Sequence, residues 1–247
     1  MPRDGAPIRE HSKRPIVTVV IPCHNHADML GFAIDSVVCQ DYRPIQIIVV
    51  DDGSSDNPKA VIDEKSDCDV SIKLLRNETA KGPSAARNMA IQDGWDKSDV
   101  FMMLDADDLY LPNKISKSVN KFLERPDLIG IVYSDAIIKN INTNTEIYEF
   151  RKPFDRELLE MECIISNTPL VTKAALSRSG GYDETMRTCE DWDLWLRITE
   201  SFVAIHIPEA LHVYNVTGRN SSDVVSKEVW NENWSKIAQR IRQRRSK

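Results

Sequence analysis

The sequence has few cysteines and no long apolar run. Its five cysteines are odd in number and no two of them form a C-x-x-C pair, so neither a disulfide framework nor a structural zinc site is expected. No apolar stretch approaches the roughly 20 residues that cross a bilayer. Residues 1–15 lack the apolar core of a secretory signal. We therefore predict a flexible N-terminal segment over 1–15 and a cytoplasmic protein.

Basic residues are in the minority. The chain carries 32 lysines and arginines against 38 aspartates and glutamates, for a formal net charge of −6. Nucleic acid is therefore not expected as its main partner. The charge is uneven, because residues 236–247 contain six basic side chains and no acid. The body is accordingly acidic and the tail basic.

Strand and helix patterns alternate along the first half of the 247 residues. β-Branched and apolar runs predict buried strands at 16–21, 45–50, 70–75, 100–104 and 129–134. Helical spacing of apolar residues predicts helices at 27–39, 58–64, 83–93 and 113–123. This alternation is typical of right-handed βαβ units, and it predicts an α/β fold with a Rossmann-like, mostly parallel sheet and flanking helices. Such sheets bind ligands beyond the carboxyl ends of their strands.

The second half of the sequence is less regular. Its patterns predict a hairpin at 137–150, a weak helix at 158–165, a short strand at 170–172, a helix at 191–200, short strands at 203–207 and 211–214, and a closing helix at 229–245. No internal repeat or low-complexity tract is present. The two halves are therefore expected to serve different purposes.

Acidic clusters follow two of the predicted strands. In the Asp-Ala-Asp-Asp run at 105–108, Asp105 and Asp107 leave the strand on the same side. Carboxylate oxygens suit Mg²⁺ or Mn²⁺, whose shell substrate phosphates and water complete. Alone, this run is also typical of a solvated acidic turn. The run at 51–56 can accept hydrogen bonds from a base or sugar, and its alternative is a turn that leads into a helix cap.

Two helix starts carry further candidate chemistry. Glu190 and Asp191 begin an amphipathic helix, where acids interact well with the helix dipole. The functional alternative is a general base that the helix and Trp192 hold rigidly. Residues 81–88 open a helix whose free N–H groups and Arg87 suit a diphosphate, and the alternative for Arg87 is a surface ion pair.

Five segments in order resemble the family 2 glycosyltransferases of the GT-A fold. They are VVIPCHN at 19–25, VVDDGSSD at 49–56, GPSAARN at 82–88, LDADD at 104–108 and EDWDLWLR at 190–197. Order and spacing agree over roughly residues 16–215. The resemblance implies one GT-A domain over 16–225, with a nucleotide-binding half at about 16–135 and a variable acceptor half at about 136–225.

The resemblance also implies an inverting transferase that uses a nucleotide-activated sugar. The residues that it assigns to the nucleotide-sugar are Pro22, His24, Asn25, Asp52, Arg87, Asp105 and Ala106. It makes Asp107 the ligand of a divalent metal, Mn²⁺ or Mg²⁺, and Asp191 the general base for the acceptor hydroxyl. Candidate contacts to the acceptor or the diphosphate are Glu190, Trp192 and Arg219.

A UDP-sugar is the expected donor, with GDP- and dTDP-sugars as alternatives. The expected acceptor is a glycan or lipid-linked glycan of bacterial surface polysaccharide synthesis. One rival function is a sugar nucleotidyltransferase, which should show a Gly-rich loop with Arg and Lys after the first strand; residues 22–26 contain none. The other is a non-catalytic nucleotide- or glycan-binding relative, against which Asp107 and Asp191 argue.

One stretch departs from the family pattern. Many members carry Tyr-Arg-x-His-Gly after the last strand, and its Arg or His contacts phosphate or metal. The aligned residues here are Tyr214-Asn215-Val216-Thr217-Gly218. Either Arg219 replaces the lost charge, or this loop contributes less to the site.

The closing helix has an apolar stripe with a basic end. The stripe consists of Trp230, Trp234, Ile237 and Ile241. A basic amphipathic helix with tryptophan suits an anionic membrane surface. We therefore expect residues 226–247 to form a C-terminal basic amphipathic helix that contacts the inner face of the membrane through 230–247. The alternative is that the tryptophans pack on the domain.

Overall fold

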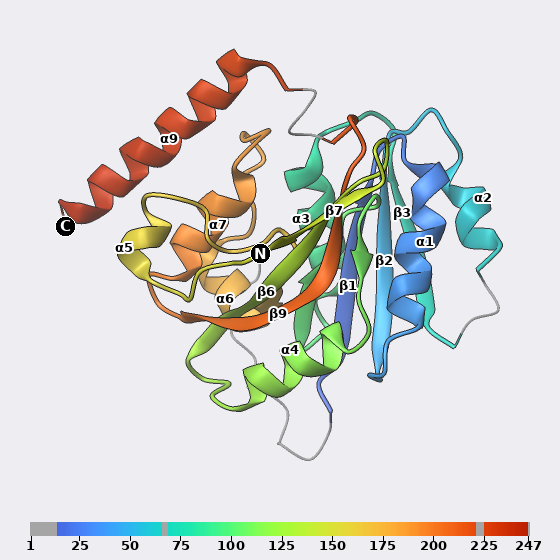
Figure 1. The fold of residues 1–247 in the computed structure, drawn as a ribbon, viewed down its shortest axis with the longest axis horizontal. Helices are drawn as coiled ribbons and strands as arrows, with labels where there is room; N and C mark the ends of the chain where they lie inside the picture. The colour runs from blue at the N-terminus through green and yellow to red at the C-terminus, as the bar shows by residue number, and fades with distance from the viewer. Residues whose placement is uncertain (1–13, 66–68, 221–224, 247) are drawn as a thin grey trace.

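A nine-stranded, mostly parallel sheet forms the centre of the computed structural model, which describes residues 14–65, 69–220 and 225–246 (Figure 1). The segment predicted to be flexible, 1–15, lies outside these residues except for its last two. The strands are β1 (Val17–Cys23), β2 (Ile45–Asp52), β3 (Ser71–Asn77), β4 (Val100–Met103), β5 (Leu109–Tyr110), β6 (Ile129–Asn140), β7 (Thr145–Glu149), β8 (Leu170–Thr172) and β9 (Val203–Val216). Their order is β3-β2-β1-β4-β8-β6-β9-β5, with β7 beside β6.

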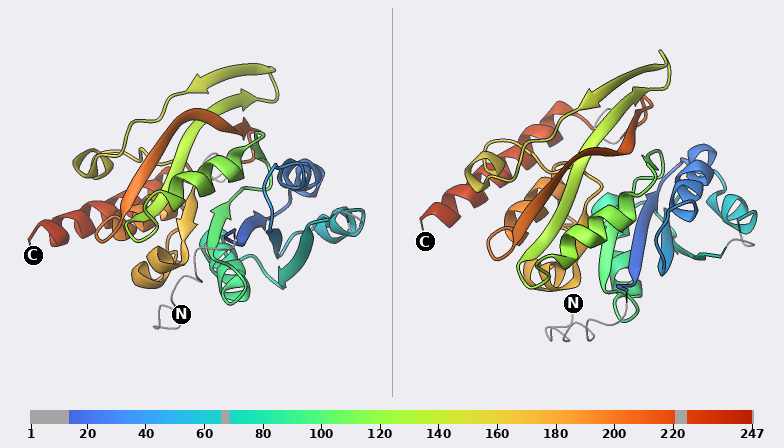
Figure 2. Two further views of the ribbon diagram at one scale, coloured as in Figure 1. Left: turned by 90° about the horizontal axis from the view of Figure 1, so that it is seen from below. Right: turned by 60° about the horizontal axis from the view of Figure 1, so that its bottom comes forward.

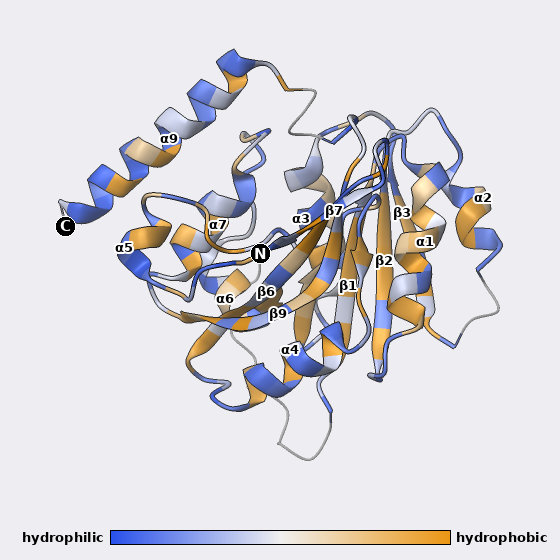
Figure 3. Ribbon diagram, viewed as in Figure 1, coloured by the Kyte–Doolittle hydropathy of each residue, from blue (hydrophilic) through white to orange (hydrophobic). Residues whose placement is uncertain are grey.

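The parallel pairing of β1 with β2 and β4, and of β2 with β3, positions the site. β1, β2 and β4 are hydrophobic and buried along most of their length (Figure 3), as strands covered on both faces must be. Because they run in one direction, their carboxyl ends meet at one edge of the sheet. Asp51-Asp52 at the end of β2 and Asp105–Asp108 after β4 therefore lie at the same edge as the end of β1. The predicted α/β class and mostly parallel sheet are confirmed.

Helices cover both faces of the sheet (Figure 2). They are α1 (Ala27–Val38), α2 (Pro58–Asp63), α3 (Pro83–Gly94), α4 (Lys114–Leu123), α5 (Arg156–Leu159), α6 (Lys173–Ser179), α7 (Glu190–Ile198) and α9 (Lys227–Arg245). Apolar residues of α1, α2 and α4 join one core cluster, while those of α3, α6, α7 and α9 join another. Among the helices of the described residues, none combines the length and apolarity that crossing a bilayer requires.

Five elements differ from the sequence prediction. The strand at 129–134 and the first arm of the hairpin are one strand, β6, and the strands at 203–207 and 211–214 are one strand, β9. Pro208 interrupts the local pattern, but the ladder continues across an irregularity in the register between β6 and β9. The predicted helix at 158–165 is a single turn, α5. The short elements β5 and α6 were not predicted.

The apolar stripe of α9 faces the domain. Ile237 is buried and Ile241 packs beside it on the second core cluster. Trp234 meets Trp192 edge to face, with ring centroids 5.8 Å apart. The packed alternative for the tryptophan stripe is thus the one that the structure shows.

Much of the basic end of α9 is paired with the domain as well. Arg240 pairs with Asp183 and Asp193, both in or next to α7, while Arg244 pairs with Glu200 and Arg245 with Glu160. Three of the six basic residues expected to face an anionic membrane thus fasten the helix to the domain.

Candidate active site

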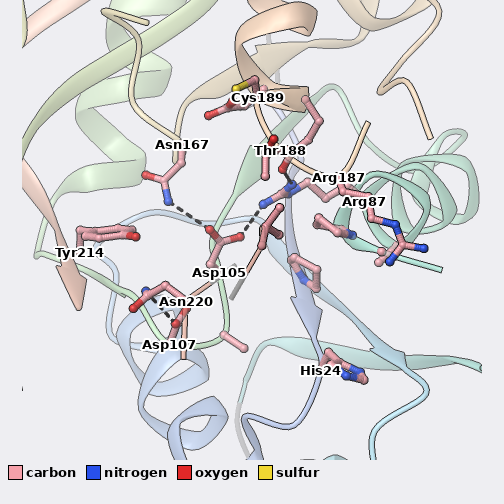
Figure 4. A pocket seen from close by; sticks show the side chains of 18 of the residues that line it. His24, Arg87, Asp105, Asp107, Asn167, Arg187, Thr188, Cys189, Tyr214 and Asn220 are labelled. Carbon is pink, nitrogen blue, oxygen red and sulfur yellow. Dashed lines mark hydrogen bonds and ion pairs between the residues drawn. The ribbon is translucent and has the colours of Figure 1, made fainter. Parts of the chain in front are cut away.

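A cavity of about 730 Å³ lies at the carboxyl edge of the parallel strands. Figure 4 shows side chains from widely separated segments converging there. The sequence-predicted residues that line it are Pro22, His24, Asp52, Arg87, Asp105, Ala106, Asp107, Glu190, Asp191, Trp192 and Arg219. The fold therefore brings together eleven of the twelve residues singled out from the sequence.

Asn25 is the exception, because it is not among the residues that line the cavity. Its backbone has a φ of 56°, a left-handed conformation that asparagine tolerates better than most residues. Its Oδ1 accepts a 2.8 Å hydrogen bond from Ser55 N and another from Ser55 Oγ. Asn25 thus ties the loop after β1 to the loop after β2.

Asp52 is anchored by the loop that precedes α3. Its carboxylate accepts hydrogen bonds from Asn77 Nδ2 at 2.7 Å, from Gly82 N at 2.7 Å and from Lys81 N. His24 Nδ1 lies 2.8 Å from the Asp52 backbone oxygen. One wall of the cavity is therefore held by bonds that converge on a single carboxylate.

Arg87 bridges two acids from opposite sides of the cavity. Its Nη2 lies 2.7 Å from Asp105 Oδ1, and its Nη1 lies 2.8 Å from Glu190 Oε1. Burial alone would lower the pKa of Arg87, but the pKa is raised well above its usual value because Asp105, Tyr182 and Glu190 surround the guanidinium. The ion pair considered from the sequence exists, but it is buried and spans the site.

Replacing Arg87 with methionine is expected to lower the free energy of unfolding by about 3–5 kcal/mol, because removing one partner of a buried pair leaves uncompensated charge. Arg219→Met is the matched control, since Arg219 pairs with Asp28 in solvent and an exposed pair contributes about 0–1 kcal/mol. Urea unfolding of both variants measures the difference. Equal small losses would contradict a buried bridge.

The three carboxylates of the 105–108 run have different surroundings. Asp105 Oδ2 accepts a hydrogen bond from Asn167 Nδ2 at 3.1 Å, and Asp107 Oδ2 accepts one from Asn220 Nδ2 at 3.2 Å (Figure 4). Asp108 is fully buried and accepts from the backbone N–H of residue 215. Asp105 and Asp107 thus face the cavity, while Asp108 braces the loop from behind.

His26 faces Asp107 rather than solvent. The side chain is largely buried, with His26 Nε2 3.8 Å from Asp107 Oδ2. That nitrogen is buried without a hydrogen-bond partner. Burial and the neighbouring Asp105 raise the pKa of Asp107 to about 6. An imidazole nitrogen and a carboxylate oxygen aimed at one another in this way fit a divalent cation.

A metal at this position would need ligands from outside the protein. In the ranges that the structure describes, no three His, Cys, Asp or Glu side chains come close enough to hold a metal ion by themselves. Mg²⁺ and Mn²⁺ commonly bind through one or two carboxylates together with substrate phosphates and water. The arrangement of Asp107 and His26 suits such an ion.

Asp191 stands at the first turn of α7. Its Oδ1 accepts a 2.6 Å hydrogen bond from Trp192 N, and the Trp192 indole donates to the Leu159 backbone oxygen. Burial and the adjacent Glu190 raise the pKa of Asp191 to about 6. A rigidly held carboxylate whose pKa lies near neutrality is suited to general base catalysis.

The stretch that departs from the family pattern supports the acidic loop instead of adding charge. Asn215 Nδ2 donates to the Asp107 backbone oxygen at 2.6 Å. Thr217 Oγ1 donates to Asn220 Oδ1, and the same Asn220 contacts the Asp107 carboxylate. Arg219 lines the cavity, but its guanidinium also pairs with Asp28 on α1.

The sequence did not indicate several of the residues that line the cavity. They are chiefly Arg151, Asn167, Arg187, Tyr214, Asn220, Trp230 and Trp234. Most lie in loops, where no periodic pattern marks them. The polar Asn167-Thr168-Pro169 stretch before β8 was the sequence feature that came closest to indicating one of them. The two tryptophans were noticed, but only as part of a helical stripe.

Comparison with known proteins identifies the family. The family model described as glycosyl transferase family 2 matches residues 18–179, more than half of the chain. The chain belongs to glycosyl transferase family 2. The suspected family is therefore confirmed, and the matched range contains the first four of the five sequence segments.

Curated relatives agree with the family assignment. An uncharacterized glycosyltransferase of Rickettsia typhi is 30% identical over 200 residues, covering 77% of this chain and 60% of its own length. The UDP-Glc:α-D-GlcNAc-diphosphoundecaprenol β-1,3-glucosyltransferase WfgD of Escherichia coli is 31% identical over 185 residues, covering 74% of this chain and 69% of its own. The chain spans 36% of a further relative from Rickettsia felis, so it corresponds to part of some longer proteins.

Two solved structures share the fold. TarS of S. aureus in complex with UDP-GlcNAc superposes with a TM-score of 0.69 at 16% identity, covering 86% of this chain and 62% of that one. The mannosyltransferase PcManGT of Pyrobaculum calidifontis, in complex with GDP-Man and Mn²⁺, gives 0.67 at 21% identity, covering 90% and 62%. The family 2 chain thus has the GT-A fold predicted for it.

Proposed function

We propose that this family 2 enzyme is an inverting hexosyltransferase that moves a sugar from a UDP-sugar to a hydroxyl of a lipid-linked glycan. The observation that carries the proposal is that one cavity contains Asp191, a carboxylate of raised pKa, together with the acidic Asp105 and Asp107. In that cavity Arg87 joins Asp105 to Glu190, the neighbour of Asp191. The relative WfgD is named for a UDP-glucose donor and a diphosphoundecaprenol-linked acceptor, which supports this donor and acceptor class and a role in bacterial surface polysaccharide synthesis.

Donor binding is assigned to the nucleotide half. Pro22, His24 and Asp52 lie along the nucleoside, while Asp105 and Arg87 lie nearer the ribose and diphosphate. Asp107, with His26 opposite, would hold the divalent metal, Mn²⁺ or Mg²⁺; the complex of PcManGT with Mn²⁺ supports this class of ion. When bound, such a metal neutralises charge that develops on the diphosphate.

The chemical step is assigned to the α7 side. Asp191 accepts the proton of the acceptor hydroxyl as that oxygen forms a bond to the anomeric carbon. The bond from the anomeric carbon to the diphosphate oxygen breaks on the opposite side, and the nucleoside diphosphate leaves with that electron pair. Attack opposite the leaving group inverts the anomeric configuration.

If the acceptor is lipid-linked, the enzyme transfers sugar at the inner face of the membrane. We infer a cytoplasmic location because of this acceptor. Direct membrane contact through 230–247 belongs to the same proposal. The packing of α9 limits such contact to its outer side, where Trp234 is half exposed. GDP- and dTDP-sugars remain the alternative donors.

A thermal-shift screen of UDP-, GDP- and dTDP-sugars, with and without Mn²⁺, tests the donor. At about 100 times its Kd, a true ligand stabilises the fold by about 2.7 kcal/mol, and we expect this for a UDP-sugar with Mn²⁺. Nucleotide release measured with a GlcNAc-diphosphate-lipid acceptor then tests transfer. Binding without acceptor-dependent release would favour a non-catalytic relative, and release of pyrophosphate from a sugar phosphate and UTP would favour a nucleotidyltransferase.

A further inference from the structure

A second hollow adjoins the active-site cavity. It measures about 360 Å³ and lies between α9 and the end of α5. Trp192 and Trp234 line both this hollow and the main cavity. Their rings meet edge to face at 5.8 Å, so one pair of tryptophans borders both spaces, and Trp192 directly follows Asp191 in the sequence.

The hollow is an apolar groove with a basic rim. Met161, Ile237 and Ile241 line it together with the two tryptophans. Met161 is 70% exposed and Trp234 is 51% exposed, although both are large apolar side chains. Adjacent exposed apolar groups of this kind are typical of a binding surface.

Two arginines, one in the main cavity and one on the rim of the groove, have no carboxylate partner among the residues that the structure describes. Arg242, on the rim, donates only to the Ala238 backbone oxygen of its own helix. Arg187 lines the main cavity and its guanidinium forms no ion pair. The next residue, Thr188, hydrogen-bonds through Oγ1 to the side-chain amide of Asn233 at 2.9 Å, which places Arg187 beside α9.

The order of these features matches one kind of molecule. The candidate base and Arg187 line the main cavity, the tryptophan pair borders both spaces, and the apolar groove lies beyond the pair with Arg242 on its rim. A sugar hydroxyl, a diphosphate and a hydrocarbon chain follow one another in a lipid diphosphate-linked sugar. Arginine suits the diphosphate through bidentate charge-assisted hydrogen bonds, and the groove suits the chain because burial removes apolar surface from water.

We propose that the groove between α9 and α5 binds the first isoprene units of a polyprenyl diphosphate-linked acceptor. The proposal rests on the proposed function, because it assigns a place to the lipid of that acceptor. It also gives α9 a purpose in this family 2 enzyme other than lying on a bilayer: the helix forms one wall of the acceptor site.

Binding of farnesyl diphosphate, measured by tryptophan fluorescence without vesicles, tests the groove independently of catalysis. Methyl diphosphate is the matched ligand without the chain. We expect farnesyl diphosphate to bind at least about tenfold more tightly, since burial of two CH₂ groups already corresponds to roughly that factor. Met161→Glu is expected to remove this preference. Phe32→Glu changes an equally exposed apolar side chain on α1 and is expected to keep it.

A transfer assay separates the two proposals. GlcNAc-diphosphate-farnesyl and GlcNAc-diphosphate-methyl are compared as acceptors, and we expect kcat/KM to favour the farnesyl compound by a similar factor in the wild type and in Phe32→Glu only. Equal binding of the two diphosphates overturns the groove, even if both acceptors are used. Farnesyl preference without transfer to either acceptor supports the groove and overturns the proposed function. Binding to phosphatidylglycerol vesicles that Met161→Glu abolishes, with equal binding of both diphosphates, would assign this surface to the membrane instead.

Discussion

Asp191→Asn is expected to lower the rate of sugar transfer by about 10²–10⁴-fold, the usual contribution of a positioned general base, while donor binding survives. Asparagine keeps an oxygen that can accept the 2.6 Å hydrogen bond from Trp192 N, so the start of α7 should be preserved. It has no basic carboxylate, so the acceptor hydroxyl would keep its proton. Steady-state transfer assays and calorimetric titration with the nucleotide separate the two effects.

Glu184→Gln is the matched control for this variant. Glu184 is an exposed acid in the loop before α7, where it accepts a hydrogen bond from Asn88. Neutralising it changes the charge near the helix by the same amount without touching the cavity, so near-normal turnover is expected. Near-normal turnover in a folded Asp191→Asn protein would refute the assignment of the base.

The pH dependence of the wild type provides a second check on Asp191. Because its pKa is raised to about 6, the rate should rise with pH through about 6 and level off above it. The free energy of unfolding should change with pH in the opposite direction to the rate. Between the unfolded pKa of about 3.9 and the folded pKa of about 6, the folded state binds more protons, so the Asp191 contribution to unfolding free energy falls as pH rises. Asp191→Asn should remove that fall and be more stable than the wild type at pH 7.5.

Asp107→Ala is expected to remove Mn²⁺-dependent donor binding and to weaken nucleotide affinity in the presence of Mn²⁺ by about 10²-fold, since a metal contributes several kcal/mol of charge stabilisation. The substitution removes the carboxylate that lies 3.8 Å from His26 Nε2. Among the described residues, it is the only carboxylate paired with His26. Calorimetric titration of UDP with and without Mn²⁺ measures the loss of binding. Metal affinity should also fall below about pH 6, because protons then compete for Asp107.

Asp108→Asn is the control within the same run. Asp108 is fully buried, does not line the cavity and accepts a backbone hydrogen bond from Asn215. An asparagine oxygen can accept that bond, so metal-dependent binding should decline far less than in Asp107→Ala. If Mn²⁺ and Mg²⁺ leave UDP binding to the wild type unchanged, the metal role is wrong.

Local patterns were sufficient for much of the nucleotide half. The strands at 16–21 and 45–50 and the helices at 27–39 and 83–93 agree with β1, β2, α1 and α3 to within two residues. These elements repeat a short unit in which each strand is buried on both faces, so apolar runs and helical spacing specify them directly. The same regularity places the motif residues after the strands, where parallel pairing gathers them.

The acceptor half depends on partners that are distant in the sequence. β9 continues past Pro208 because β6 pairs along most of its length. Asn167 and Asn220 meet the acidic loop from segments 59 and 113 residues away. No periodicity in either segment indicates such a contact, since it arises from how the loops cross the sheet edge.

The sequence by itself determined the family, the α/β fold and eleven of the residues around the cavity, because those features follow from short motifs at the ends of regular elements. Only the tertiary structure decided where the C-terminal helix packs. In the sequence, the apolar stripe and the basic charges of this helix are equally consistent with contact to a membrane surface and contact to a protein surface. The choice depends on acids such as Asp183 and Asp193 lying opposite Arg240, and on Trp192 lying against Trp234, which is a matter of position in space rather than order along the chain.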